Sequence, residues 1–442
     1  MSKKVLFSSV GGTDPIKYFR DGAMLHILRV YKPDVVYLYL SKHMYNYHIT
    51  DNRYVYCIEK LGELLNHSFK VHIVERPELE EVQDFDYFYE DFNKVISNII
   101  NEYKDYSILL NVSSGTPAMK GALQTMAALS EFKMIPIQVT TPIKRINVHD
   151  QNLDDYDVEV NWELNEDNDE NFENRCVESK GENQLAAIKK NVVARHIDAY
   201  DYVAALSVSN DIRTFLREDL FKLLRAANYR LQLNFSGMDT ELKNTAYDIL
   251  PVKDHERKII LEYLLSLNIK VIKEEYADFI RATTPVIAEL FELVLKRICN
   301  IDVNRYCDRI KNNNNIVIRR WSREKLSSNP SLLGVLDKHF SGGIKETPLA
   351  SYHMSVIIDA YCTDMNVINT VADLRNVEQR VRNLTAHEII SVTDEWIKNE
   401  TGYKSEEIIN KLKYLANVSG MNISRELWDS YEDMNKLIKS LL

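Results

Sequence analysis

The chain has 442 residues, of which 45% are hydrophobic and 27% charged, and its formal net charge is −10 at pH 7. This length and composition predict two or three globular domains and exclude a disordered or fibrous chain. No apolar run approaches the roughly 18 residues of a membrane span, and there is no signal-peptide pattern, so we expect neither a membrane protein nor a secreted one. The net charge also argues against tight, unselective binding of nucleic acid.

The five cysteines are scattered along the chain without metal-ligand spacing. An odd number of unpaired thiols is typical of a reducing compartment. We therefore predict a cytoplasmic protein without a metal site or a bound cofactor.

Residues 1 to about 145 alternate short apolar runs with helix-like stretches. The apolar runs are Val5–Val10, Val35–Leu40, Phe69–Val74, Ile108–Val112 and Met134–Val139, and the helix-like stretches lie near 16–30, 52–65, 86–103 and 117–131. Short buried strands separated by helices indicate a parallel sheet covered on both faces. The prediction is a doubly wound, Rossmann-like α/β domain with a mostly parallel sheet.

Two strand-to-helix turns in this domain are suited to an anion. The first turn contains Gly11, Gly12, Thr13, Asp14 and Pro15, and the second contains Asn111, Ser113, Ser114, Gly115, Thr116 and Pro117. Proline suits the first position of a helix, which makes Asp14 and Thr116 the expected N-caps. Backbone N–H groups and a helix N-terminus would then face a ligand at the carboxyl end of the sheet.

The ligand class is narrowed by what these turns lack. Neither turn has the Walker pattern or the Gly-x-Gly-x-x-Gly fingerprint, so ATP and NAD are disfavoured. Hydroxyl and amide groups without a carboxylate cluster suit a ribose-phosphate or a base. Ordinary tight turns without a ligand are the alternative interpretation.

Acidic residues and asparagines dominate from Asp154 to Glu173, which we interpret as a solvated hairpin or linker with a domain edge near 150–180. Beyond it the hydrophobic period is helical, and we predict an all-α remainder. The expected helices are 185–206, 211–227, 241–250, 255–267 and 276–299. A second domain boundary is placed between Lys270 and Tyr276.

The most basic stretch runs from Arg305 to Lys325 and contains Trp321. Cations beside an aromatic side chain are typical of a surface that stacks bases, so the stretch is a candidate RNA surface. The alternative is a solvated helix end with Trp321 packed inward.

Near the C-terminus, Arg382, Asn383 and His387 form the pattern Arg-Asn-Leu-Thr-Ala-His. An arginine can neutralise charge on a phosphate, and a histidine titrates near neutral pH, so the pair is a minimal kit for cutting RNA without a metal. The spacing alone is weak, because Arg20 and His26 show it too, and we interpret that pair as incidental.

The helix that leads into this motif is predicted from Val371, Leu374, Val377, Val381 and Leu384. Five residues turn an ideal helix by about 500°, so Arg382 and His387 would not share one face of a straight helix. The Thr385–Glu388 segment has the form of a capping box, and we expect a kink or a new helix from Thr385 through Trp396.

In that geometry His387 would exchange a proton with the 2′-hydroxyl or the 5′-oxygen of RNA, and Arg382 would stabilise the phosphorane. Asn383 would orient the phosphate or the imidazole. The products would be a 2′,3′-cyclic phosphate and a 5′-hydroxyl. A site assembled from two copies of the motif would supply both an acid and a base.

These parts together resemble the type III-A CRISPR-associated ribonucleases of the Csm type, which join an N-terminal CARF domain, a helical middle and a C-terminal HEPN domain. The HEPN signature is matched by Arg382, Asn383 and His387, and Tyr276–Cys299 looks like the first HEPN helix. The two glycine-containing turns look like the CARF ligand loops. The resemblance implies a CARF domain over 1–175, a helical middle over 176–272 and a HEPN domain over 273–442.

The resemblance further implies a homodimer that is activated by a cyclic oligoadenylate from the type III-A interference complex and degrades single-stranded RNA. A ring of six is favoured over a ring of four. The implied ring contacts are Gly11, Gly12, Thr13, Asp14, Asn111, Ser113, Ser114, Gly115, Thr116 and Lys120. Some relatives also cleave the ring, for which Thr13, Asp14 and Thr116 are the candidates. Many CARF loops have a cation directly after the Gly-Thr pair, whereas this chain has Pro117 there and its next cation at Lys120.

Two other functions remain open from the sequence. One is a non-catalytic switch that senses a nucleotide and binds a partner through its helices. The other is a constitutive HEPN toxin ribonuclease, which would leave the sheet domain without a purpose.

Overall fold

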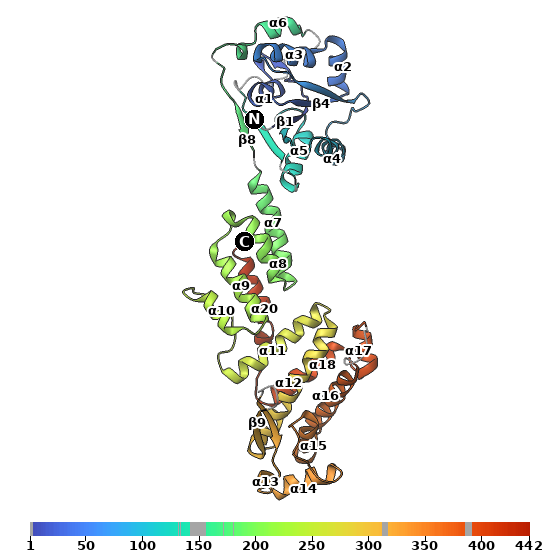
Figure 1. Ribbon diagram of the computed structural model, residues 1–442, viewed down its shortest axis with the longest axis vertical. Helices are drawn as coiled ribbons and strands as arrows, with labels where there is room; N and C mark the ends of the chain where they lie inside the picture. Colours follow the sequence, from blue (N-terminus) through green and yellow to red (C-terminus); the bar gives the residue numbers. More distant parts are fainter. Residues whose placement is uncertain are drawn as a thin grey trace. The chain divides into compact units, whose positions relative to one another are not determined.

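The computed structural model describes residues 3–130, 132, 134–141, 156–170, 172–179, 181–311, 317–384 and 391–442, and for residues 382–384 it describes the backbone only. By its internal contacts the chain divides into two compact units, Met1–Ile188 and Lys189–Leu442. Figure 1 shows the elements of each unit. This division does not test the three predicted domain ranges, which stay a prediction.

The N-terminal unit contains, among the described residues, a six-stranded sheet in the order β5-β4-β1-β6-β7-β8. The strands are β1 (Lys4–Ser9), β4 (Val35–Ser41), β5 (Lys70–Arg76), β6 (Ser107–Asn111), β7 (Met134–Val139) and β8 (Cys176–Glu178). All neighbours from β5 to β7 are parallel, and β8 pairs antiparallel with β7. The predicted mostly parallel sheet is confirmed, and β8 is an edge strand that the sequence did not reveal.

Helices cover both faces of this sheet (Figure 1). Helices α1 (Ala23–Tyr31) and α3 (Arg53–Leu65) share one core with the sheet, while α4 (Phe85–Glu102) and α5 (Pro117–Leu129) share the other. On β1, Leu6 joins the first core, and Val5 and Phe7 join the second. The side chains of a strand alternate between faces, so burial on both faces produces the continuous apolar runs of the sequence.

The predicted helix over 16–30 is wrong in its first half. Strands β2 (Ile16–Lys17) and β3 (Arg20–Asp21) form a short antiparallel hairpin, and α1 begins only at Ala23. A Cβ at Gly22, the residue before α1, would lie 2.4 Å from the carbonyl oxygen of Thr13, so the chain enters the helix through a close backbone approach that requires glycine. Helix α2 (Lys42–Asp51), which follows β4 directly, was not predicted.

The acidic segment is not the solvated linker that its composition suggested. It contains α6 (Val158–Glu163) and the 3₁₀ helix η2 (Glu166–Asn168), and both Asn165 and Asp167 are 2% exposed. Asp167 Oδ2 accepts a hydrogen bond from the backbone of Asp21 at 2.8 Å. The segment packs on the sheet domain because arginines of that domain compensate its carboxylates.

The C-terminal unit is helical, as predicted. Its helices are α7 (Glu182–Asp198, which crosses the unit boundary), α8 (Tyr202–Asp211), α9 (Glu218–Leu231), α10 (Phe235–Leu242), α11 (His255–Ile272), α12 (Tyr276–Arg297), α13 (Arg323–Leu326), α14 (Pro330–His339), α15 (Ser351–Tyr361), α16 (Met365–Leu384), α17 (Asp394–Thr401), α18 (Ser405–Val418), α19 (Arg425–Trp428) and α20 (Ser430–Lys439), with 3₁₀ helices η3 (Arg213–Phe215) and η4 (Val303–Tyr306). The structure adds an antiparallel hairpin, β9 (Cys307–Lys311) and β10 (Val317–Trp321), that was not predicted.

The predicted helix over 241–250 is also wrong, because α10 ends at Leu242 and Asn244 adopts a left-handed conformation with φ of 64°. Among the described residues, no helix has both the length and the apolar character that crossing a bilayer requires.

Helices α12, α15, α16 and α18 pack around one shared core in the C-terminal unit. The core contains Leu290 of α12, Ile358 of α15, Leu374 of α16 and Leu412 of α18, all fully buried. The buried face of α12, a helix that the sequence predicted, is therefore a packing face within the chain. This bundle positions α16, the helix that carries Arg382.

The last helix, α20, returns to the helices that precede the bundle. The amide of Asn435 donates to the carbonyl of Ile197 at 3.0 Å, and its Oδ1 accepts from the Tyr202 hydroxyl at 2.8 Å. A buried pair, Arg230 and Glu262, lies beside this helix, and the Arg230 guanidinium also donates to Ser430 Oγ at 2.8 Å. The C-terminus is thus tied to α7, α8 and α9 by polar contacts as well as by packing.

Candidate functional site

The two predicted ligand loops meet at the switch point of the sheet. Strands β1 and β6 are neighbours, and the connections that follow them lead to opposite sides of the sheet. A Cβ at Gly11 would lie 2.7 Å from the backbone nitrogen of Gly115, and Ser9 Oγ donates to the carbonyl of Ser114 at 2.9 Å. The structure therefore brings together two turns that are about a hundred residues apart in sequence.

Asn111 shapes the second loop. Its Oδ1 accepts hydrogen bonds from the backbones of Ser113 at 2.9 Å and Ser114 at 3.2 Å, and its Nδ2 donates to Ser8 Oγ at 2.8 Å. Asn111 is fully buried. Because all of these contacts are internal, Asn111 supports the loop from beneath and does not face solvent.

Asp14 contacts the start of α1 across the intervening hairpin. Its carboxylate accepts from the backbone of Gly11 at 3.0 Å and from the backbone of Met24, in the first turn of α1, at 3.0 Å. Pro15, joined to Asp14 by a cis peptide bond, precedes β2 and does not open a helix. Burial raises the pKa of Asp14, and these backbone hydrogen bonds oppose the rise. The prediction that Asp14 is an N-cap is wrong, because no helix opens at Pro15 and Gly22 is the N-cap of α1; Asp14 instead contacts the first turn of α1 from across the hairpin.

Thr116 is the N-cap of α5, as predicted, with Pro117 at the first helical position. Its hydroxyl accepts from the backbone of Met119 at 3.3 Å and donates to the carbonyl of Val82 at 2.7 Å. Lys120, one turn into α5, is half-buried, and its charge is close enough to oppose the rise that burial causes in the pKa of Asp14.

A small pocket of about 60 Å³ opens beside the two loops. Of the predicted ring contacts, Thr13 and Ser113 line it, and Gly12 lies exposed nearby in sequence. Three cations that the sequence analysis missed also line it: Lys17, Arg20 and Arg175. None of the three belongs to a glycine-containing turn, and Arg175 comes from the far end of the acidic segment. An arginine just after an acidic run was the one signal that could have identified it.

The wall of this pocket continues into a buried polar network. The carboxylate of Asp21 accepts from Arg29 at 2.7 Å and 3.0 Å, and that of Asp167 accepts from Arg20 at 3.1 Å and Arg175 at 3.0 Å. His26 is fully buried among them, and its Nε2 accepts from the backbone of Arg175 at 2.9 Å. Burial, with the nearby positive charge of Arg175, lowers the pKa of His26 to about 3.

Asp21, His26 and Asp167 are also the group of potential metal ligands found among the described residues, with their ligand atoms within 4.8 Å of one another. The three arginines already neutralise the two carboxylates, and both ring nitrogens of His26 contact Arg175. This donor set is satisfied by side chains and fits a structural network better than a metal.

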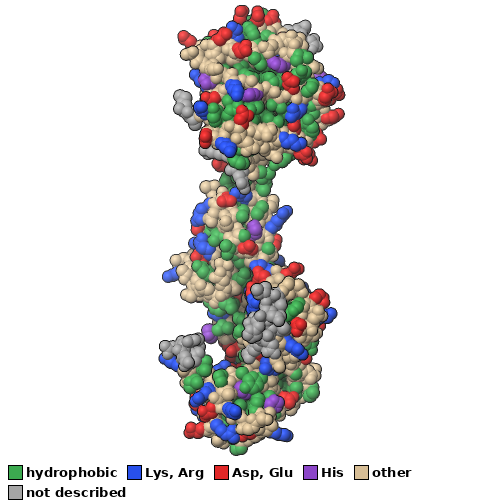
Figure 2. Space-filling model, turned by 45° about the vertical axis from the view of Figure 1, so that its right-hand side comes forward, with side chains coloured by type: hydrophobic (Ala, Val, Ile, Leu, Met, Phe, Trp, Pro, Cys, Tyr) green, Lys and Arg blue, Asp and Glu red, His purple; other side chains and the backbone are tan. Residues whose placement is uncertain are grey.

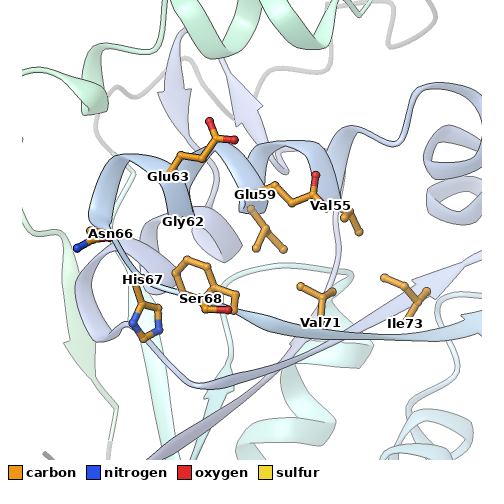
Figure 3. A pocket seen from close by; sticks show the side chains of 11 residues that line it. Val55, Glu59, Gly62, Glu63, Asn66, His67, Ser68, Val71 and Ile73 are labelled. Atoms are coloured by element: carbon orange, nitrogen blue, oxygen red, sulfur yellow. The ribbon is translucent and has the colours of Figure 1, made fainter.

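A larger pocket, of about 770 Å³, lies elsewhere in the N-terminal unit, between α3 and the edge strand β5 (Figure 3). Figure 3 shows Val71 and Ile73 on β5, and Val55, Glu59 and Glu63 on α3. Glu63 pairs with Lys60 at 2.8 Å, but the lining itself contains two carboxylates and no lysine or arginine, so this pocket is less suited to an oligonucleotide despite its size.

The motif predicted to cut RNA is described only in part. Arg382 and Asn383 lie in the last turn of α16, and His387 lies outside the described residues. The predicted helix from Thr385 through Trp396 is wrong at its end, because residues 391–393 are not helical and α17 begins at Asp394 under a Thr393 cap. The predicted helix that leads into the motif is described through Leu384, and whether it ends there lies outside the described residues.

The basic stretch 305–325 is largely neutralised. Arg319 pairs with Glu292 at 2.7 Å, Arg323 with Asp337 at 2.8 Å and Lys325 with Asp308 at 2.8 Å. Trp321 is fully buried. These contacts favour the packed interpretation over an RNA surface. On the face shown in Figure 2, cations and acidic side chains are interspersed over the described residues of both units.

Models of three domains match the chain in the order that the structure shows. The Cas_Csm6 CARF domain matches residues 70–176, the CRISPR-associated protein Csm6 6H domain matches 179–231, and the Cas_Csm6 HEPN domain matches 249–439. The second loop and strands β5, β6 and β7 lie within the residues that the CARF model matches, whereas β1, β4 and the first loop precede them; α16 lies within the residues that the HEPN model matches.

Relatives are found over the whole chain. The CRISPR system endoribonuclease Csm6 of Mycobacterium tuberculosis is 30% identical over 431 residues, which is 97% of either chain. The Csm6 of Streptococcus thermophilus is 29% identical over 66% of this chain and 67% of the relative. A solved structure, Enterococcus italicus Csm6 bound to cyclic hexa-2′-fluoro-hexa-dAMP, matches with a TM-score of 0.69 and 21% identity over all of both chains, which shows a shared fold. The chain therefore belongs to the Csm6 family of CRISPR system endoribonucleases and carries the CARF and HEPN domains of that family.

Proposed function

We propose that the protein is a ribonuclease switched on by a cyclic oligoadenylate, which the CARF loops sense and to which the HEPN motif responds. The meeting of the two loops at the switch point of the sheet, beside a pocket lined by cations, carries this proposal. Open α/β sheets bind ligands at such a point. The domain ranges 1–175, 176–272 and 273–442 belong to the same proposal, as does a cytoplasmic setting, which the five free cysteines support.

The activator is a ring that spans two copies of the protein. A pocket of about 60 Å³ has room for a phosphate group and is far below the roughly 300–1,000 Å³ of usual ligand pockets. Each copy of a homodimer would therefore hold only part of a ring through its two loops. The cyclic hexanucleotide in the Enterococcus italicus relative supports a ring of six over a ring of four. The interference complex of the type III-A system would supply it.

The chemistry lies with Arg382, Asn383 and His387 and uses no metal. A base removes the proton of the RNA 2′-hydroxyl, the 2′-oxygen bonds to phosphorus, and the 5′-oxygen leaves with a proton from an acid. His387 from each of two copies supplies the base and the acid, and Arg382 stabilises the charge on the phosphorane. Asn383 orients the phosphate. Single-stranded RNA is thus cut to a 2′,3′-cyclic phosphate and a 5′-hydroxyl end.

Ring cleavage in the CARF domain, if it accompanies activation, falls to Thr13 among the three candidates. Asp14 is 5% exposed and bonded to two backbone N–H groups, and the Thr116 hydroxyl has both a donor and an acceptor within the protein. Thr13 lines the pocket. Loss of ring turnover in Thr13→Ala, with activation preserved, is the expected result.

The test measures cleavage of a fluorophore-quencher RNA in EDTA, with cyclic tetra- and hexa-adenylate added separately. We expect cleavage only with a ring, and loss of cleavage in His387→Ala. His255→Ala is the matched control, because His255 is an exposed histidine of the same unit, at the start of α11.

Each other outcome favours a different function. Cleavage without a ring favours a constitutive toxin, and silence with either ring favours a non-catalytic switch. Cleavage that survives His387→Ala would overturn the assignment of the motif.

A further inference from the structure

Arg175 lines the pocket and directly precedes β8, the strand after which the chain leaves the N-terminal unit. Its side chain lines the pocket with Thr13 and Ser113, and its backbone begins the segment that pairs with the sheet edge. The backbone of Thr140 donates to the carbonyl of Arg175 at 3.0 Å, which extends the β7–β8 ladder by one step. Strand β8 follows at once, and α7 then carries the chain across the unit boundary.

The Arg175 guanidinium holds four segments in place. Nη1 donates to the carbonyl of Thr140 at 3.1 Å, and Nη2 donates to the carbonyl of Asp21 at 3.1 Å and to Asp167 Oδ2 at 3.0 Å. Nη2 also lies 3.0 Å from Nδ1 of His26. These contacts join the end of β7, the β2–β3 hairpin, η2 and α1. The position of β8 therefore depends on which groups this side chain contacts.

Of the three arginines in the network, Arg175 lines the pocket and, among the described residues, makes only one hydrogen bond to a carboxylate, that of Asp167. Arg29 clamps Asp21 through two nitrogens, is 5% exposed and does not line the pocket. Arg20 lines the pocket and pairs with both Glu166 and Asp167. Arg175 has a single carboxylate bond, to an oxygen that also accepts from the backbone of Asp21. An incoming anion thus competes most easily for Arg175.

We propose that Arg175 is a phosphate-contacting residue of the activator pocket, and that on binding its guanidinium exchanges the Asp167 carboxylate for a phosphodiester oxygen and loosens the start of β8. This inference rests on the proposed function, since it takes the cyclic oligoadenylate as the ligand. A guanidinium binds phosphate in the same fork geometry as carboxylate. The arginine therefore has an anionic partner both before and after the exchange. Arg175 also supplies a cation that the second loop lacks where Pro117 follows Thr116.

The experiment compares Arg175→Gln with Arg29→Gln in the full-length protein. The two arginines share one buried network, and only Arg175 lines the pocket. We expect Arg175→Gln to weaken binding of cyclic hexa-adenylate at least tenfold and to make the remaining binding less dependent on salt. Arg29→Gln should change ring affinity less than threefold, although it lowers thermal stability.

Hydrogen exchange provides the readout that a structural role alone would not move. In the wild type, ring binding should speed exchange of the amides in 172–179, and in Arg175→Gln the ring should leave it unchanged. If Arg175→Gln fails to fold, Arg175→Lys decides, because it keeps the charge and loses the fork. It should bind the ring at least threefold more weakly than Arg29→Lys.

The outcomes separate this inference from the proposed function. A wild type that binds the ring, with an Arg175 variant of equal affinity and salt dependence, overturns the role of Arg175 and leaves the proposed function standing. Protection of 172–179 on ring binding overturns the loosening of β8. A wild type that binds no ring overturns both.

Discussion

Each unit of the molecule buries a network of ion pairs, and the two networks differ in their access to solvent. In the C-terminal unit, the Arg230 side chain is 0% exposed and binds Glu262 at 2.8 Å while lying over the ring of Tyr431 at 4.0 Å. In the N-terminal unit, the side chain of Arg175 is 9% exposed and that of Arg20 is 28% exposed, and both face a pocket.

This difference separates a structural ion pair from one that a ligand can use. A sealed pair such as Arg230 with Glu262 has no competitor, and its removal leaves a buried charge without a partner. A pair on a pocket wall can exchange its carboxylate for another anion. The same chemistry therefore fastens α9 to α11 in one unit and is available to a phosphate in the other.

The largest expected effect is on the rate of RNA cleavage, and it tests whether the proposed cleavage site in the C-terminal unit is distinct from the proposed ring site in the N-terminal unit. His387→Ala should lower the rate of RNA cleavage by about 10²–10⁴-fold, because it removes the group that transfers the proton. The affinity for cyclic hexa-adenylate, measured by titration calorimetry, should not change. A parallel loss of ring affinity would mean that the motif belongs to the sensing site.

The next largest effect is on stability and comes from the buried ion pair of Arg230 and Glu262. Glu262→Ala should lower the free energy of unfolding of the C-terminal unit by about 3–5 kcal/mol, because Arg230 is left buried without its carboxylate. The measurement is urea unfolding with hydrogen exchange resolved by unit. A change below about 1 kcal/mol would show that Arg230 finds another partner and would make the two networks alike.

Gly115 tests the junction of the ligand loops. Its φ is 86°, and an added Cβ would lie 2.7 Å from both Met119 Sδ and Ser9 Oγ. Gly115→Ala should destabilise the N-terminal unit by about 1–3 kcal/mol and weaken activation by the ring, because the two loops must part.

Gly402 is the matched control for this substitution. It has the same φ of 86°, and an added Cβ there meets nothing within 4 Å. Gly402→Ala therefore measures the backbone strain alone, and ring activation should stay normal. Equal effects of the two substitutions on ring activation would argue against a tight junction.

The smallest effect is a pH dependence that both units share in direction. The folded pKa of His26 is about 3 and that of an unfolded histidine about 6.5, so below pH 6.5 the unfolded state binds a proton that the folded state refuses. Stability must fall as the pH falls through this window, by about 2 kcal/mol between pH 6.5 and 5. His26→Gln should remove that part of the loss in the N-terminal unit.

His353 offers the same test in the C-terminal unit. Burial lowers its pKa to about 4, so the loss of stability begins at the same pH and ends earlier. His353→Gln should flatten the pH profile of the C-terminal unit only. If the pH dependence of a unit's stability is unchanged by the substitution of its own histidine, the burial of that imidazole ring is contradicted.

By itself, the sequence determined the features that depend on neighbouring residues. The parallel α/β class followed from the spacing of the apolar runs, and the Thr116 cap with Pro117 followed from the preferences of a helix start. The Asp14 prediction was wrong, because the helix that Asp14 contacts begins after a hairpin that the local pattern does not show. The order of Arg382, Asn383 and His387 was readable from the chain alone.

Only the tertiary structure decided which distant side chains meet beside the two loops. Asp167 meets Asp21 across 146 residues of sequence, and Arg175 meets His26 across 149. Composition suggested a solvated linker for that segment, since acidic residues are usually hydrated. Arg20 and Arg175 instead compensate its carboxylates, and Arg29 donates to Asn168, so the segment packs on the sheet domain. Charge compensation over such separations depends on the packed geometry, and no local pattern in the sequence records it.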